Sequence, residues 1–121
     1  MRFTQDHQWI QLDGEVATLG VTAYGAEKLG DVIEVGQPAA GQTLRTGGPM
    51  ARVEGVRTRA DLPAPVDGEV VEANGALPDE PDLINAGPES LGWLLKLKPT
   101  DPKQVDALMD RTAYEAYLDS L

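Results

Sequence analysis

The pattern of apolar and polar positions predicts a β-hairpin near the start of the chain. Apolar and β-branched residues are frequent at positions 9–12 and 16–21, and the pair Asp13-Gly14 lies between these two runs. An Asp-Gly pair between two strand-like runs is a strong signal for a tight hairpin turn. The first two strands of the protein are therefore expected here.

Two similar six-residue segments predict a repeat in the fold. Gly30–Val35 and Gly68–Ala73 stand 38 positions apart, and both contain glycine, an acid, valine, a β-branched residue, glutamate and an apolar residue in that order. Strands favour few residue types, so chance similarity between two strands is one explanation. The other is a pseudo-two-fold arrangement, in which two similar sheet halves face each other across one core.

Between these segments the sequence predicts a second hairpin. Ala51 and Val53 alternate with charged residues, which is typical of a strand with one apolar face. The alternation breaks at Gly55–Thr58, which suggests a turn. This pattern places Arg57 at the tip of a turn between two short strands.

Residues 76–91 are predicted to form a loop, because they contain three prolines and four acids. A strand is expected at 93–98, before Pro99.

Helices are predicted at 22–29 and in the C-terminal tail. Thr22 is expected to be the N-cap of the first helix, and Gly30 follows its end. In the tail, Asp101-Pro102 precedes one helical pattern, and Thr112 begins another as half of a capping box with Glu115. The buried stripe of the last helix is expected to consist of Tyr114, Tyr117, Leu118 and Leu121.

Composition indicates one globular domain, residues 1–121, with few residues suited to catalysis, and the protein is not expected to be an enzyme. The chain is 41% hydrophobic and 25% charged, and it contains no cysteine, one histidine and two serines. These counts exclude thiol catalysis and disulfides and leave little material for a hydrolytic triad. No apolar run approaches the roughly 20 residues of a membrane span, and the first residues lack an apolar signal core, so a cytoplasmic protein is expected.

The charge is strongly acidic and unevenly distributed. The net charge is −10, and residues 61–121 carry thirteen acids against four bases. Nucleic acids and anionic membranes are therefore not expected as partners. The exception is a cluster of four of the six arginines within fifteen residues, Arg45, Arg52, Arg57 and Arg59.

The order of short motifs resembles the glycine cleavage H-protein family over nearly the whole chain. The matching segments are Asp6–Trp9, Gly14–Thr22, Leu29–Val32, Val53–Arg57, Asp61-Leu62, Ala64–Glu72, Leu83–Asn85, Gly92–Leu94 and Lys96–Pro99. The resemblance implies a mainly β fold with short helices and a helical C-terminus. The expected fold is the lipoyl-domain-like barrel-sandwich hybrid, which has two antiparallel sheets related by a pseudo-two-fold.

The resemblance also identifies the position at which the family carries its cofactor. The family holds lipoate on a lysine at the hairpin tip, in a run like Val-Glu-Ser-Val-Lys-Ala, and this chain has Val53-Glu54-Gly55-Val56-Arg57-Thr58. Amide formation needs a neutral primary amine, whereas arginine is effectively always protonated. No lipoate is therefore expected on Arg57, and no cofactor is expected in the protein.

Two further positions correspond to the family's cleft for the loaded arm. The family's His-Glu-Trp is His7-Gln8-Trp9 here, so Gln8 replaces the glutamate that receives the arm's amino group. Asp61 matches the family's aspartate. Together with Glu54 and Arg57, these residues form the expected cofactor-binding set.

Two functions follow from these differences. In the first, the protein is a monomeric accessory module without lipoate that binds other proteins, such as glycine cleavage subunits or lipoate-handling enzymes, through its arginine tip. The alternative is a working H protein that shuttles the aminomethyl group on another lysine. The lysines available are Lys28, Lys96, Lys98 and Lys103, and none is expected at a turn tip. The arginines would otherwise be solvated, pairing loosely with Glu54 or Asp61.

Overall fold

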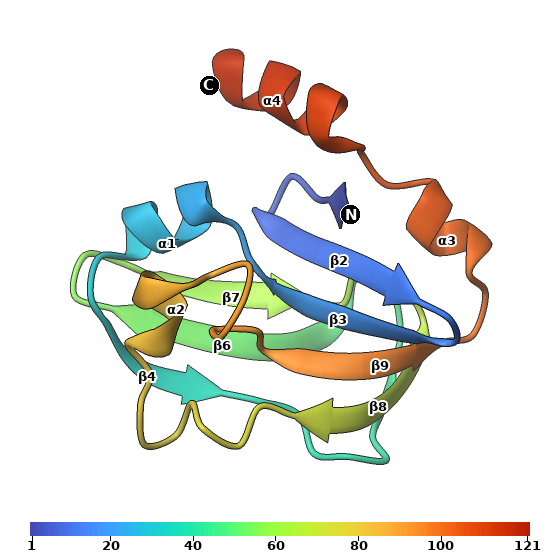
Figure 1. Ribbon diagram of the computed structural model, residues 1–121, viewed down its shortest axis with the longest axis horizontal. Coiled ribbons are helices and arrows are strands. Elements are labelled where there is room, and N and C mark those ends of the chain that lie inside the picture. The colour runs from blue at the N-terminus through green and yellow to red at the C-terminus, as the bar shows by residue number, and fades with distance from the viewer.

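The computed structural model describes residues 1–121 and contains two antiparallel sheets with four short helices (Figure 1). The strands are β1 (Arg2–Phe3), β2 (Gln8–Asp13), β3 (Val16–Val21), β4 (Val32–Gly36), β5 (Thr43–Leu44), β6 (Pro49–Gly55), β7 (Arg59–Pro63), β8 (Gly68–Ala73) and β9 (Leu95–Pro99). The helices are α1 (Ala23–Leu29), α2 (Leu83–Ala86), α3 (Lys103–Asp106) and α4 (Arg111–Asp119).

The two sheets enclose the main hydrophobic core without closing into a barrel. The larger sheet has the strand order β1-β2-β3-β9-β8-β5, and the smaller has β4-β6-β7. Leu19 and Leu97 of the larger sheet and Val53 of the smaller one are fully buried in one cluster of 20 residues. The mainly β fold expected from the sequence is therefore confirmed.

The first predicted hairpin and helix are also confirmed. Strands β2 and β3 pair from Asp13↔Val16 to Gln8↔Val21. The side chain of Thr22 caps α1 by accepting a hydrogen bond from the Gly25 amide at 3.2 Å. Gly30 ends the helix in the left-handed region, with a φ of 71°.

The 38-residue repeat is present in the structure at β4 and β8, which lie in different sheets. Each strand has a bulge at the same place in the repeat, between Val32 and Glu34 in β4 and between Val70 and Glu72 in β8. Chance similarity in strand composition does not explain a shared bulge, since a bulge is a local change in pairing register. The two segments are therefore equivalent parts of the two sheets.

The predicted loop 76–91 was wrong in part, because it contains the helical turn α2. Two short strands, β1 and β5, were not predicted at all, since two residues are too few to show a periodic pattern. The strand expected at 93–98 spans Leu95–Pro99 instead. Of the helix expected after Asp101-Pro102, only Lys103–Asp106 is helical.

The predicted start of the last helix was also wrong. Helix α4 begins at Arg111, and Asp110 caps it by accepting a hydrogen bond from the Ala113 amide at 2.8 Å. Aspartate is at least as good an N-cap as threonine, and of these two residues Asp110 is the one that caps the helix. Leu121 lies beyond the helix and is 63% exposed, so it does not belong to the buried stripe.

Tyr114 attaches α4 to the rest of the protein. Its ring stacks on Phe3 with the centroids 4.7 Å apart. Its hydroxyl lies 2.7 Å from Thr22 Oγ1 and 2.9 Å from His7 Nδ1. His7 is the one non-glycine residue with a positive φ, 62°. Helix α4 is therefore held in part by a polar contact of Tyr114 with the residues that precede β2 and α1.

This contact predicts a loss of stability in mild acid. Burial lowers the pKa of His7, the nearby Lys28 lowers it further, and Asp6 opposes them. A histidine in an unfolded chain has a pKa of about 6.5. Because the unfolded chain binds this proton more readily, stability is lost as the pH falls below that value toward the folded-state pKa.

We expect the melting temperature to fall between pH 7 and pH 5 by more in the parent than in His7→Asn. Asparagine tolerates a positive φ, so it preserves the backbone at this position. Thermal unfolding followed by circular dichroism at several pH values measures the difference. An identical decline in both proteins would show that His7 does not contribute to it.

Candidate functional site

The predicted hairpin tip is formed by Val56, Arg57 and Thr58, between β6 and β7. The Gly55 amide closes the turn by donating to the Thr58 carbonyl at 2.9 Å. The strands pair from Glu54↔Arg59 back to Pro49↔Pro63. Arg57 is exposed, as expected for a tip residue.

The tip is bonded to the C-terminal end of α1. The amides of Val56 and Arg57 donate to the carbonyls of Asp31 and Leu29, both at 2.9 Å. Gly55 lies so close to this segment that a Cβ atom there would overlap the Leu29 carbonyl oxygen. Glycine at this position is therefore required by the close approach of two backbone segments.

The side chain of Arg57 folds back along the same segment. Its Nη1 donates to the Glu27 carbonyl at 3.3 Å. A Cβ on Gly30 would lie 2.8 Å from Arg57 Cγ, so the aliphatic stem of Arg57 packs directly over this glycine. A cation at the C-terminal end of a helix also interacts favourably with the helix dipole.

Asn85, from α2, holds the segment to which the tip is bonded. Its Nδ2 donates to the Gly30 carbonyl and its Oδ1 accepts from the Val32 amide, both at 2.9 Å. Helices α1 and α2 lie side by side in Figure 1. This role of Asn85 was not predicted, because the residue lies in the stretch expected to form a loop.

Gln8 is buried inside the protein and forms a hydrogen bond with the backbone of Pro63. Its side chain is 1% exposed, and Nε2 donates to the Pro63 carbonyl at 2.9 Å. Its Oε1 is buried and has no hydrogen-bond partner. The amide group is therefore needed as a donor, which an ionised glutamate could not be.

Asp61, Glu54 and the neighbouring arginines lie along the hairpin. Arg59 pairs with Asp61 at 3.3 Å, in agreement with the expected loose pairing. Arg52 pairs with Glu34 at 3.5 Å, in place of the predicted Glu54 or Asp61. Glu54 is half-buried and lies in register between Glu34 and Arg59. No hydrogen bond or ion pair connects Arg57 to Gln8, Glu54 or Asp61.

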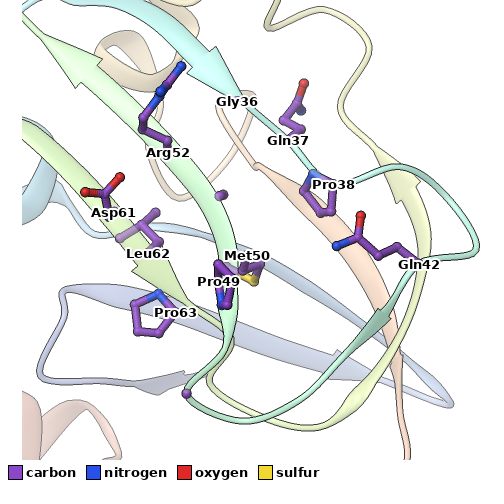
Figure 2. A pocket seen from close by; sticks show the side chains of 12 residues that line it. Gly36, Gln37, Pro38, Gln42, Pro49, Met50, Arg52, Asp61, Leu62 and Pro63 are labelled. Atoms are coloured by element: carbon purple, nitrogen blue, oxygen red, sulfur yellow. The ribbon is translucent and has the colours of Figure 1, made fainter.

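Asp61 borders an open cleft of about 750 Å³ at the ends of β4, β6 and β7. Figure 2 shows Pro49, Met50 and Pro63 on these strands, with Pro38 and Gln42 across from them on the segment that follows β4. Gln8 does not line this cleft. The cleft presents the carboxylate of Asp61, but that carboxylate is already paired with Arg59.

A smaller cleft of about 450 Å³ lies at the tip, lined by Tyr24, Glu27, Lys28 and Arg57. The sequence did not predict that Lys28 is close to Arg57, because the two residues are 29 positions apart and meet only where the end of α1 folds against the tip. This cleft brings two cations together. No group of three or more histidine, aspartate or glutamate side chains is arranged to hold a metal ion.

The family assignment follows from the match over the complete chain. The model of the family "Glycine cleavage H-protein" matches residues 1–121. The chain belongs to this family. Proteins of the glycine cleavage H-protein family are non-catalytic carriers, so the expectation that the chain is not an enzyme is confirmed.

The relatives support the assignment in both sequence and structure. The chain is 53% identical over 121 residues to the glycine cleavage system H protein of Caulobacter vibrioides, and the alignment covers 100% of each chain. It is 51% identical over 118 residues to that of Phenylobacterium zucineum, covering 98% of each. A crystal structure of a glycine cleavage system H protein from Mycobacterium marinum superposes with a TM-score of 0.86 at 34% identity, covering 98% of this chain and 95% of that one. None of the four helices is long and apolar enough to cross a membrane.

The lipoyl group that the H-protein resemblance implies does not fit the residues at this tip. The attachment position has a guanidinium in place of a primary amine, and this group is hydrogen-bonded to the end of α1. Guanidinium is delocalised and always charged, so it is a poor nucleophile toward an activated carboxyl. The tip of this H-protein family member therefore offers charge and hydrogen-bond donors, but no acylation site at residue 57.

Proposed function

We propose that this member of the glycine cleavage H-protein family carries no lipoate and acts as a monomeric accessory module in the cytoplasm that binds other proteins through its hairpin tip. The observation that supports the proposal is Arg57 at the attachment position, with its stem over Gly30 and its Nη1 on the Glu27 carbonyl. A chain without cysteine accords with a reducing compartment.

The charge at the tip supports binding to proteins. Arg52 and Arg59 are paired with carboxylates, whereas Arg57 has none within ion-pairing distance. A guanidinium pairs with a carboxylate through two parallel hydrogen bonds, so an unpaired one at a tip favours an acidic partner. Glycine cleavage subunits and lipoate-handling enzymes are the proposed partners, because the H-protein resemblance implies that both classes act on the tip when it carries lipoate.

The alternative, a carrier lipoylated on another lysine, gains no support from the positions of the lysines. Lys96 and Lys98 lie in β9 and approach Glu72 and Glu15 at 3.9 Å and 3.8 Å. Lys103 is in α3 and Lys28 is in α1. None of them is on a hairpin tip, where a long arm could reach partners freely.

Intact-mass measurement on protein from the native host tests the proposal, and an unmodified mass is expected. Incubation with a lipoyl ligase and lipoate should likewise leave the parent unchanged, because it offers no amine at the tip. Arg57→Lys supplies the matched positive control and should gain a lipoyl adduct, more slowly than an H protein with lysine because α1 holds the stem of residue 57. A lipoyl adduct on the native protein would overturn the proposal, and peptide mapping would locate the lysine.

A further inference from the structure

We propose that the cleft between α1 and the hairpin tip binds a side-chain carboxylate from an acidic segment of a protein partner. The cleft is lined by Tyr24, Glu27, Lys28 and Arg57 and has a volume of about 450 Å³, which is enough for one side chain. This inference rests on the proposed function, because it specifies which group of a partner the tip recognises.

The first observation is that both cations of this cleft lack a carboxylate. The protein contains twenty acids and ten bases, and five of the bases form ion pairs within 4.0 Å. These five are Arg52, Arg59, Lys96, Lys98 and Arg111. Lys28 and Arg57 are unpaired although acids outnumber bases by two to one. Two neighbouring free cations in so acidic a chain form a local site for an anion.

The second observation is that both cations are held in place. Arg57 is fixed by its backbone bond to the Leu29 carbonyl, by its packing over Gly30 and by the bond from Nη1 to the Glu27 carbonyl. Arginine has five N–H donors, so four of them remain for a ligand. Lys28 Nζ lies 5.4 Å from the centroid of the Tyr24 ring, within cation–π range. A carboxylate would therefore meet donors that are already positioned.

Glu27 limits which anions can enter the cleft. Its carboxylate lines the same cleft but lies beyond ion-pairing distance of both cations. A phosphate dianion in the cleft would be repelled by it more than one side-chain carboxylate would. Val56, next to Arg57, is 63% exposed and offers an apolar contact beside the charged groups. This combination fits an acidic peptide better than an isolated phosphate.

Nuclear magnetic resonance can test the site on the unmodified, full-length protein. Titration of ¹⁵N-labelled protein with hexaglutamate in about 20 mM salt should give saturable shifts at the amides of residues 24–31 and 55–58. Lys28→Gln should weaken binding about threefold, as expected for one partly exposed ion pair. Glu27→Gln should strengthen it by a similar factor. Lys103→Gln, which removes an unpaired lysine in α3, is the matched control and should leave the affinity unchanged.

Several outcomes would overturn the inference. Equal affinities of Lys28→Gln and Lys103→Gln would show that only net charge matters. Binding of inorganic phosphate at these residues, with no response to hexaglutamate, would overturn the assignment to an acidic peptide. The outcome of this test can also be distinguished from the outcome of the test of the proposed function. A lipoyl adduct on the native protein together with hexaglutamate binding would overturn that function alone, whereas an unmodified protein without hexaglutamate binding would overturn the cleft alone.

Discussion

Replacing Gly55 by serine is expected to destabilise the protein by about 2–3 kcal/mol, the usual cost of forcing extra atoms into a packed site. The reason is that a Cβ at this position overlaps the Leu29 carbonyl oxygen and lies 2.7 Å from the Leu29 carbonyl carbon. Backbone atoms cannot move aside as a flexible side chain can. At this position the family's attachment run, Val-Glu-Ser-Val-Lys-Ala, has serine. The substitution that restores the family residue is therefore expected to lower the stability of this protein.

Urea unfolding measures the effect, and Gly75 supplies a matched control. No atom lies within 4 Å of a Cβ built at Gly75, so Gly75→Ser should stay within about 0.5 kcal/mol of the parent. The tip of Gly55→Ser should also separate from α1, which amide exchange at Val56 and Arg57 would detect. Equal unfolding midpoints for the two serine variants would show that the close approach does not constrain residue 55.

Replacing Gln8 by glutamate is expected to cost about 3 kcal/mol at neutral pH, because it leaves a buried charge without compensation. Gln8 Nε2 donates to the Pro63 carbonyl at 2.9 Å, and a carboxylate would present an oxygen to that carbonyl oxygen. A protonated glutamic acid can still donate. Its pKa in the folded protein should therefore lie above the value of about 4.3 in an unfolded chain.

The sign of the pH dependence follows from this raised pKa. The folded variant binds the proton more tightly than the unfolded chain, so stability is lost as the pH rises past about 4.3 and is lowest above the folded-state pKa. Urea unfolding of Gln8→Glu between pH 4 and pH 8 should show this decline relative to the parent. Gln8→Met removes the same hydrogen bond without adding a titrating group, so its destabilisation should not vary with pH. A variant Gln8→Glu as stable as the parent at pH 8 would contradict the burial of this side chain.

Local signals in the sequence were enough to predict the elements that carry the site. Asp13-Gly14, the cap at Thr22 and the break at Gly55–Thr58 each depend on neighbouring residues, and the structure confirms all three. The turn that carries Arg57 was predicted in the same way, whereas the H-protein resemblance identified Arg57 as the attachment position. The H-protein resemblance then provided the arrangement of the two sheets, which no single segment indicates.

The parts that could not be predicted depend on contacts between distant segments. Lys28 meets Arg57 only because α1 ends against the tip, and Asn85 reaches Gly30 across 55 positions. Gln8 was interpreted as a cleft residue. Its burial could not be predicted, because it depends on a contact with Pro63, which lies in the other sheet. The start of α4 was mistaken for a different reason. Asp110 and Thr112 are both good caps, and sequence alone does not choose between them.

The bonds between the tip and α1 have a consequence for how this protein associates. A lipoyl arm explores many orientations and loses that freedom when a partner captures it. Here the amides of Val56 and Arg57 and the stem of Arg57 are already ordered in the free protein. Each rotamer-rich side chain that need not be immobilised on binding spares about 0.5–1.5 kcal/mol of ordering entropy. In the proposed function the tip therefore acts as a preorganised recognition element, because its hydrogen-bond donors are positioned before a partner binds.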